Sequence, residues 1–497
     1  MLFNSYIFVL LFLPLCLVGW FSLNRLPSRK PALLFLLGMS LWFYGYFNPK
    51  YIPIILCSIG GNYLLSRLMQ KAAASENTQQ RTAPPRKTIL LALGLLANIG
   101  VLFYYKYMNF FLTEAGSILG ETFTLHTIVL PLGISFFTFQ QISFLVDSWR
   151  GETEAYSLLE YACFVAYFPQ LIAGPIVTHD ELIPQLRAPE NRRLNWDNLA
   201  RGLYLFSLGL GKKVLLADLF GNVANVGFNG VDALDSTGAL VSMLAYTLQI
   251  YLDFSGYCDM AMGIGKMMNI NLPGNFDSPY KALDIQDFWD RWHKTLTRFL
   301  TRYVYIPLGG SRKGKLRTYV NVILVFLISG LWHGAGMSFL FWGVLHGAAS
   351  VLTRMVKASP GLQKLHPPKW LRWLLTFAFL NITWVFFRAN SLSEGFRFIS
   401  ALFSGNFGPV AEGYLSAFHL PEVTALRRWF SIDSPNYPAM LIGFFLLNLL
   451  SVLFLPNDLE KTERFQPTAG RMVYAAVVFV WSVFSLSGVS TFLYFNF

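Results

Sequence analysis

Long apolar runs recur along almost the whole chain, and this feature limits the possible folds more than any other. Hydrophobic residues make up 54% of the 497 residues and charged residues only 13%, whereas average globular chains carry about 25% charged residues. A helix of about 20 mostly apolar residues can span a bilayer. The pattern therefore predicts an all-α polytopic membrane protein with one integral-membrane domain over residues 1–497.

Several of these apolar runs are interrupted by Gly, Pro or polar residues, so some helices are expected to be broken or re-entrant. We expect 11 to 13 membrane-embedded helices. The first run, about Tyr6 to Leu23, has no basic residue before it and no small-residue cleavage site. It is therefore predicted to be a retained helix and not a signal peptide. The runs begin near residues 6, 32, 51, 88, 127, 158, 199, 238, 319, 337, 371, 439 and 472.

Basic residues in two early loops predict the orientation of the protein. One group lies between the first two runs and a second between the third and fourth, so both loops fall on the same side. Because cytoplasmic loops carry an excess of Lys and Arg, that side is predicted to be cytoplasmic and the N-terminus outside. Within the second of these loops, the polar and Pro-containing residues 72–86 are the expected flexible linker. The basic residues are Arg25, Arg29, Lys30, Arg67, Lys71, Arg81, Arg86 and Lys87.

The net charge of +12 has the same explanation, because the basic residues are scattered between apolar runs. This scatter favours the membrane rule over nucleic-acid binding. The four cysteines are far apart and form no Cys-x-x-Cys pair, so they are expected to pack as small core residues. No two histidines have the spacing of a helical metal site, and no metal is assigned. The cysteines are Cys16, Cys57, Cys163 and Cys258.

One histidine, His333, lies in Leu331-Trp332-His333-Gly334, inside an apolar stretch of roughly residues 319–345. An ionisable side chain at bilayer depth is costly and is a candidate functional residue. Neutral imidazole suits a general base near pH 7, and burial keeps it neutral. A tight interhelical contact with one hydrogen bond is the structural alternative.

A second histidine, His293, lies in a segment that we expect to form one amphipathic helix from Asp284 to Tyr305. Trp289, His293, Leu296 and Leu300 share its apolar face. His293 is therefore a candidate partner of His333, and simple packing is the alternative. The opposite face carries a charged stripe of Asp290, Lys294, Arg298 and Arg302.

The region from Lys281 to Arg317 is strongly basic, with nine Lys and Arg against three acids. It could form a collar that binds anionic lipid heads, or a cationic mouth for a phosphorylated donor. Gly309-Gly310-Ser311 could offer backbone amides to phosphate, although this is not a Walker loop. Arg312 and Lys313 are the candidate donor-binding residues.

The other polar residues in apolar surroundings are assigned lesser roles. His346 is predicted to make a polar contact within the bundle. Asp253, Ser255 and Asp259 resemble a triad, but polar lining is the favoured interpretation. The remaining histidines, in loop-like, polar or Pro-flanked contexts, are expected to be ordinary. They are His126, His179, His366 and His419.

Several segments resemble the membrane-bound O-acyltransferase family, in its bacterial branch typified by the alginate O-acetyltransferase membrane subunit. The match extends over most of the chain in order, from Pro131–Phe137 to the C-terminal Phe492–Phe497. It includes the two histidine segments Phe288–His293 and Gly330–Ala335. The other matching segments are Phe168–Pro175, Tyr251–Ala261, Asn275–Tyr280 and Tyr305–Gly310.

The resemblance implies that His333 is the essential catalytic histidine and His293 the second characteristic one. It also implies a helical bundle around a central tunnel, acetyl-CoA as the acyl donor, and an SGNH-hydrolase-like partner that completes transfer to an exported polysaccharide. An alginate-like acceptor is the main prediction. Peptidoglycan, cellulose or D-alanyl transfer to teichoic acid are alternatives on the same fold, and a proton-coupled transporter is an alternative of another class. No permanently bound cofactor is expected.

Overall fold

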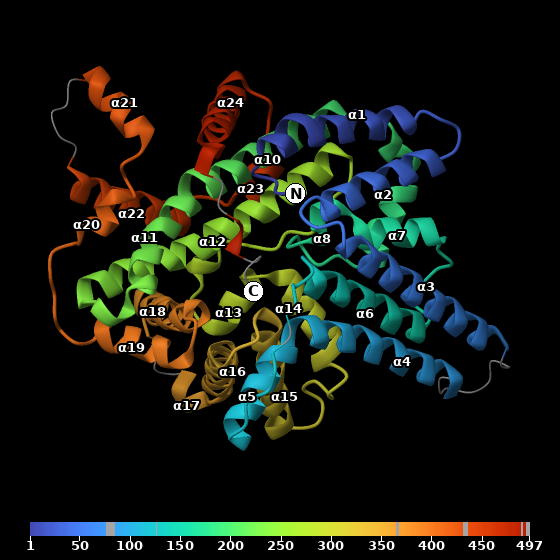
Figure 1. The fold of residues 1–497 in the computed structure, drawn as a ribbon, viewed down its shortest axis with the longest axis horizontal. Coiled ribbons are helices and arrows are strands. Elements are labelled where there is room, and N and C mark those ends of the chain that lie inside the picture. Colours follow the sequence, from blue (N-terminus) through green and yellow to red (C-terminus); the bar gives the residue numbers. More distant parts are fainter. Residues whose placement is uncertain (76–84, 126, 364–366, 431–435, 489–490, 494–497) are drawn as a thin grey trace.

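All regular secondary structure in the described part of the chain is helical. The computed structural model describes residues 1–75, 85–125, 127–363, 367–430, 436–488 and 491–493, and within these ranges it has no β-strand. The long helices cross one another in several groups, with α12 running through the middle of the molecule (Figure 1). The predicted all-α class is therefore confirmed.

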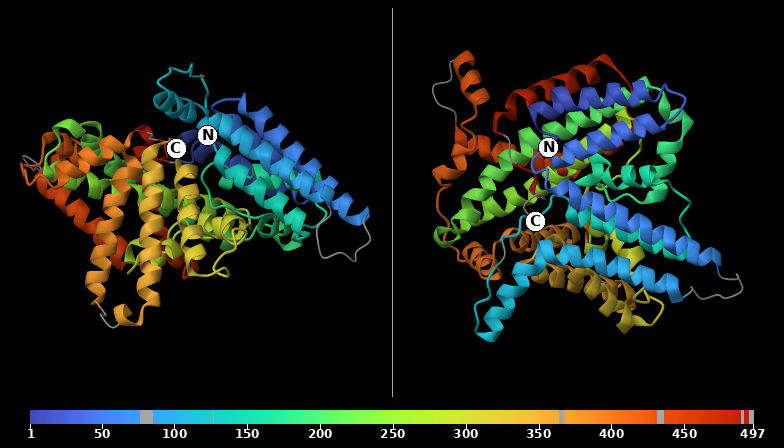
Figure 2. Two further views of the ribbon diagram at one scale, coloured as in Figure 1. Left: turned by 90° about the horizontal axis from the view of Figure 1, so that it is seen from below. Right: turned by 45° about the vertical axis from the view of Figure 1, so that its right-hand side comes forward.

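Two groups of helices make up the first third of the chain. Helices α1 and α2 pack together, and α3, α4 and α6 form a second layer beside them (Figures 1 and 2). A π-helical turn, η2, joins α4 to α5. Their bounds are η1 (Phe8–Phe12), α1 (Leu13–Leu23), α2 (Lys30–Gly45), α3 (Tyr51–Ser75), α4 (Pro85–Leu102), η2 (Phe103–Tyr107), α5 (Met108–Leu119) and α6 (Ile134–Arg150).

The middle of the chain builds the core. The longest helix, α12, packs against α10 and α11 and is buried over most of its length. The bounds are α7 (Leu158–Ala166), α8 (Phe168–Leu171), α9 (His179–Arg187), η3 (Pro189–Arg192), α10 (Trp196–Gly211), η4 (Lys212–Ala217), α11 (Asp218–Asn229), η5 (Val231–Ala233), α12 (Ser236–Met267), η6 (Pro279–Lys281), α13 (Ile285–Arg291), α14 (Lys294–Leu300) and η7 (Thr301–Tyr305).

The last third begins with the antiparallel pair α15 and α16, and α18 packs beside α16 (Figure 2, left). The bounds are α15 (Lys315–His333), α16 (Met337–Ala358), α17 (Pro360–Gln363), α18 (Lys369–Arg388), α19 (Leu392–Leu402), α20 (Glu412–Ser416), α21 (Pro421–Phe430), α22 (Tyr437–Phe454), α23 (Asp458–Glu463), α24 (Ala469–Phe484) and η8 (Ser485–Gly488).

Six helices of the described residues are long and apolar enough to cross a membrane: Tyr51–Ala72, Arg86–Leu119, Lys315–His333, Met337–Ala358, Lys369–Arg388 and Tyr437–Phe454. Each begins within four residues of a predicted start. The span expected from near residue 158 is wrong, because α7 ends after nine residues, where Tyr167 leaves the helical conformation before Phe168-Pro169. The total of 11 to 13 embedded helices and the central tunnel stay predictions, and most of the 72–86 linker lies outside the described residues.

The apolar stretch around His333 folds as a helical hairpin, in agreement with the two starts predicted near residues 319 and 337. Helix α15 ends at His333 and α16 starts at Met337. The two helices approach so closely that a Cβ atom on Gly343 would lie 2.5 Å from the carbonyl oxygen of Phe326. Small residues permit such contacts in membrane helices. His333 therefore lies at the tip of a tight hairpin.

The single amphipathic helix expected from Asp284 to Tyr305 is also wrong. The chain breaks at His293, which adopts the left-handed conformation with φ 45° and separates α13 from α14. The loop after α12 accounts for this break, because it forms backbone hydrogen bonds on both sides of it. The amide of Asp277 donates to the carbonyl of Arg291, and the amide of Lys294 donates to the carbonyl of Asn275, each at 3.0 Å.

Candidate functional site

The fold brings the two predicted histidines together, although 40 positions separate them in sequence. The ring centroids of His293 and His333 lie 6.5 Å apart. Both side chains are buried, at 0% and 3% exposure. His333 comes from the end of α15 and His293 from the break between α13 and α14. Two imidazoles at this distance can act on one substrate group.

Asn275 holds the His293 ring in one orientation. Its Oδ1 atom lies 3.0 Å from His293 Nδ1 and also accepts hydrogen bonds from the amide and hydroxyl of Thr295. A carbonyl oxygen can only accept, so Nδ1 carries the proton and Nε2 has the lone pair. Burial lowers the pKa of His293 to about 3, so the ring is neutral at physiological pH.

Aromatic side chains surround the His333 ring. Trp342 and Phe387 meet it edge to face, with centroids 5.4 and 5.1 Å away. The neighbouring Trp332 stacks on Phe139, which in turn stacks on Phe299 of α14. This stack connects α15, α6 and α14, and so fixes the hairpin tip against the segment that carries His293. An apolar enclosure of this kind excludes water and keeps imidazole neutral.

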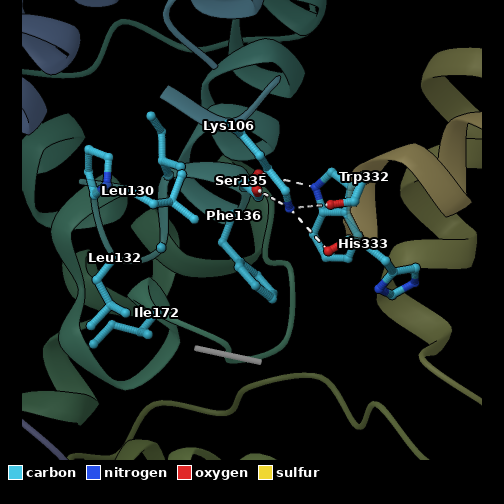
Figure 3. Close-up of a pocket in the computed structure, with 11 residues that line it drawn as sticks. Lys106, Leu130, Leu132, Ser135, Phe136, Ile172, Trp332 and His333 are labelled. Atoms are coloured by element: carbon cyan, nitrogen blue, oxygen red, sulfur yellow. Dashed lines mark hydrogen bonds between the residues drawn. The ribbon is translucent and has the colours of Figure 1, made fainter. Parts of the chain in front are cut away.

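The backbone of the hairpin tip is held from the opposite side by η2. The Lys106 ammonium donates to the carbonyls of Trp332 and His333, at 2.6 and 3.2 Å, and lies 3.3 Å from the hydroxyl of Ser135. The Tyr107 hydroxyl donates to the carbonyl of Leu331. Figure 3 shows Lys106 directed at these carbonyls while the His333 ring points away from it. A small cavity of about 60 Å³ adjoins this contact.

A larger cavity, of about 380 Å³, lies between α13, α14, α15 and α16. Its wall includes Trp289, whose indole N–H donates to His346 Nδ1 at 3.2 Å. The other ring nitrogen of His346 lies 3.1 Å from the hydroxyl of Thr383. The predicted role of His346 as a polar contact within the bundle is confirmed. Its contacts make it part of the wall between this cavity and the aromatic enclosure of His333.

Acidic residues from outside the basic segment pair with two of its arginines, so its net positive charge is partly compensated in the fold. Arg298 pairs with Glu181, and Arg302 pairs with Asp147 and Glu152. Arg312 and Lys313 are exposed on the turn before α15. This turn lies at the far end of α15 from His333, roughly 27 Å away at 1.5 Å per residue. The two cations therefore cannot touch the histidine pair, but could contact the distant end of a long donor.

The glycines of this turn do not provide the predicted phosphate cradle. The amide of Gly309 donates to the carbonyl of Ile306, and that of Gly310 donates to the carbonyl of Tyr305, both at 2.9 Å. Because both donors are used inside the turn, the expectation that they bind phosphate is wrong.

Among the histidines expected to be ordinary, His179 is buried and has polar partners. It is buried at the start of α9, where Nδ1 lies 3.0 Å from the Tyr156 hydroxyl and Nε2 lies 3.4 Å from Asp147. His419 is exposed, as expected. His126 and His366 lie outside the described residues.

The favoured interpretation of polar lining agrees with the structure, because no triad forms among Asp253, Ser255 and Asp259. Each of these side chains instead contacts a lysine of η4. Asp253 pairs with Lys213 at 2.7 Å, and Asp259 pairs with Lys212. Lys212 also pairs with Asp458 of α23 at 2.8 Å. Of the four cysteines, Cys57 is exposed and only the other three pack in the core. Within the described ranges, no three His, Cys, Asp or Glu side chains converge as metal ligands would.

Three features of the site were missed by sequence reasoning. Lys106, Asn275 and the Lys212 ion pairs act through partners that are distant in sequence, and their local patterns are unremarkable. Lys106 had one usable signal, because it is a cation far from both ends of the apolar helix Arg86–Leu119. Asn275 lies in a segment that we had matched to a family, but no spacing connected it to His293.

Comparison with known proteins gives a consistent result. The model of the membrane-bound O-acyltransferase family matches residues 85–393. A peptidoglycan O-acetyltransferase of Helicobacter pylori is 41% identical over 100% of this chain and 98% of its own length. Probable alginate O-acetylases of Pseudomonas putida and Azotobacter vinelandii are 36% and 37% identical over 86% of this chain, and over 84% and 82% of their own lengths.

Proposed function

Since the chain belongs to the membrane-bound O-acyltransferase family, we propose that it transfers acetyl groups from acetyl-CoA towards peptidoglycan, with His333 as general base. It is a multi-pass membrane O-acyltransferase. The observation that carries the proposal is the placement of His333 beside His293 in a closed aromatic enclosure. The transporter alternative does not account for the family membership.

The choice of acceptor rests on the relatives. The family resemblance by itself predicts an alginate-like polymer, with peptidoglycan among the alternatives. The Helicobacter pylori peptidoglycan O-acetyltransferase aligns with the whole chain at higher identity than the alginate O-acetylases, which align with 86% of it. These alignments support peptidoglycan over alginate.

The chemistry requires one proton transfer and one bond exchange. An acceptor hydroxyl attacks the thioester carbonyl of acetyl-CoA, its proton moves to the His333 imidazole, and the C–S bond breaks. The imidazolium then returns the proton to the departing thiolate, so that one ester and one free thiol are formed. His293, with its Nδ1 proton directed to Asn275, contributes a neutral second imidazole on the donor side.

The proposed route of the donor runs along α15. Acetyl-CoA is polyanionic and long, and the exposed Arg312 and Lys313 lie at the end of α15 opposite His333. The middle of α15 lines the 380 Å³ cavity with Val322, Val325 and Ser329. In this proposal the phosphates bind at the basic turn and the thioester arm follows the cavity towards the histidines.

Transfer to a polymer outside the membrane also needs a recipient on that side. We therefore propose an exported SGNH-hydrolase-like partner for the last step, and an orientation with the N-terminus outside. The basic residues at 25–30 and 67–87 support this orientation through the positive-inside rule.

A measurement of ester-linked acetate tests the function. Deleting the gene should remove base-labile acetate from purified peptidoglycan, and the wild-type gene should restore it. His333→Ala at equal membrane level should not restore it. Unchanged acetate after deletion would contradict the peptidoglycan proposal, and loss of acetate from an exported alginate-like polymer instead would return the acceptor to our first prediction.

Cysteine labelling tests the donor side. On a cysteine-free background, Gln80→Cys and Ser311→Cys should each resist a membrane-impermeant thiol reagent in intact cells and react in inverted vesicles. Labelling at Gln80→Cys in intact cells would overturn the orientation. Labelling at Ser311→Cys alone would place the basic turn outside and remove Arg312 and Lys313 from the donor route.

A further inference from the structure

The proposed reaction uses the imidazole rings of the two histidines, but the structure also holds the His333 backbone in an unusual way. The last carbonyls of a helix have no partner within the helix. In α15 these carbonyls, at Leu331, Trp332 and His333, receive hydrogen bonds from Tyr107 and Lys106 of η2. Both donors come from one π-helical turn more than 200 positions earlier in the chain.

The Lys106 charge has no acidic counterpart. No carboxylate of the described residues forms an ion pair with it, and its neighbours are carbonyl oxygens and the Ser135 hydroxyl. A cation in a spanning helix is costly and is retained where it has a function. The negative end of a helix dipole is a favourable site for a cation, which explains how α15 accommodates this one.

The same contact joins three elements. Ser135 lies in the first turn of α6, and its carbonyl accepts a hydrogen bond from the Trp332 indole at 3.4 Å. Gly133, just before α6, has φ 72°, and a Cβ there would lie 2.6 Å from the carbonyl of Leu171. The backbone near Ser135 is therefore closely packed, and Lys106 connects it to the hairpin tip. After His333 the chain continues as Gly334-Ala335-Gly336, which offers little stiffness of its own.

We propose that Lys106 is a positioning residue for the acyl transfer, which binds the C-terminal carbonyls of α15 and so holds the His333 ring against His293. This rests on the proposed function of His333. Lys106 does not touch the reacting atoms, because its ammonium faces the backbone while the ring points away (Figure 3). Its removal should release the last turn of α15, and misplacing a reacting group by about 1 Å can cost about 100-fold in rate.

The test separates turnover from donor binding in membrane vesicles that hold the full-length protein and its exported partner, with acetyl-CoA and peptidoglycan fragments as substrates and thiol release as the readout. Lys106→Met should lower kcat by about 100-fold and leave KM for acetyl-CoA within about twofold. Lys71→Met, which removes an exposed lysine, is the matched control and should change neither constant. An unchanged kcat in Lys106→Met would overturn the proposal, as would a rise in KM with kcat intact.

Chemical rescue distinguishes positioning from general destabilisation. The cavity of about 60 Å³ beside Lys106 gives a small amine a place to bind. Lys106→Ala should regain part of its kcat with n-propylammonium, in a saturable manner, and none with 1-propanol. If Lys106→Met does not accumulate, Lys106→Gln replaces it, with an expected loss of about tenfold. Absence of rescue together with a kcat loss matched by lowered thermal stability would mean a merely structural role.

Hydrogen–deuterium exchange tests the role of Lys106 independently of the proposed acetyl transfer. Lys106→Met should speed amide exchange in the peptide around His333 by at least about tenfold, and leave exchange in α12 unchanged. If the wild-type protein releases no thiol from acetyl-CoA, the proposed function fails while exchange still reports on Lys106. Unchanged exchange at the hairpin tip would overturn the role of Lys106 whatever the activity.

Discussion

The two ends of α15 differ sharply in how their ionisable groups are held. At the C-terminal end, His333 is buried among aromatic rings and its carbonyl is bonded to Lys106. At the N-terminal end, Arg312 and Lys313 are exposed, on a turn whose glycine amides bond within the turn. At the C-terminal end the groups are held in one geometry, whereas at the N-terminal end two exposed cations supply a positive potential.

This difference predicts different kinetic behaviour at the two ends. Groups fixed in an apolar enclosure act over short distances, so changes there should reduce kcat and be insensitive to salt. Exposed cations act through a screened potential, whose reach is about 8 Å at physiological ionic strength. Changes at the basic turn should therefore raise KM and depend on salt.

The largest effect is expected at the buried end. His333→Ala should reduce acetyl transfer by 10²–10⁴-fold or more, because a general base contributes about this much. Ester-linked acetate and thiol release both report the loss, with membrane level as the control. Acetyl transfer near the wild-type rate by this variant would show that His333 is not the general base and that the two ends of α15 do not differ as proposed.

His293→Ala should have the next largest effect, about 10–100-fold in kcat, since the second imidazole assists and does not replace the base. Asn275→Leu removes the acceptor that orients this ring and should lose about tenfold. The kcat and KM of both variants are compared with those of the wild type. A rise in KM with kcat intact would make His293 a donor-binding residue, and no change in either constant would leave it only a packing role.

The double change Arg312→Gln and Lys313→Gln should raise KM for acetyl-CoA about tenfold and leave kcat unaltered. Charge-assisted contacts to phosphate are each worth about 1.5–3 kcal/mol in favourable cases, and exposure reduces this. The effect should shrink at high salt. Lys71→Gln with Arg86→Gln removes two exposed cations elsewhere and is the control. An unchanged KM with lowered membrane level would assign the turn to lipid binding.

The smallest effect is expected at His346, between the cavity and the enclosure. Thr383→Val removes the hydroxyl beside its Nε2 atom and should lower the free energy of unfolding by about 1 kcal/mol. The acetyl-transfer rate should fall by less than about threefold, as measured by thiol release. A loss of rate comparable to that of His293→Ala would show that the contact between His346 and Thr383 contributes to acetyl transfer.

The predicted spans were accurate where the pattern was continuous. The starts expected near residues 51, 337 and 371 agree with Tyr51, Met337 and Lys369 to within two residues. The errors occur where distant segments intervene. Nothing local marks a break at His293, because the helical pattern of apolar residues continues through it. The break depends on the preceding loop, where the carbonyl of Asn275 accepts a hydrogen bond from the amide of Lys294 and the amide of Asp277 donates to the carbonyl of Arg291.

The sequence by itself determined that this chain is a helical membrane protein and that His333 and His293 were its candidate reactive groups. Length and apolarity decide whether a helix can span a bilayer, and a histidine in such surroundings is conspicuous because it is costly. Only the tertiary structure decided that the two rings lie close together, that Asn275 sets the proton position on His293, and that Lys106 binds the carbonyls of α15. These relations depend on distances between residues far apart along the chain, and no periodicity or composition encodes a distance.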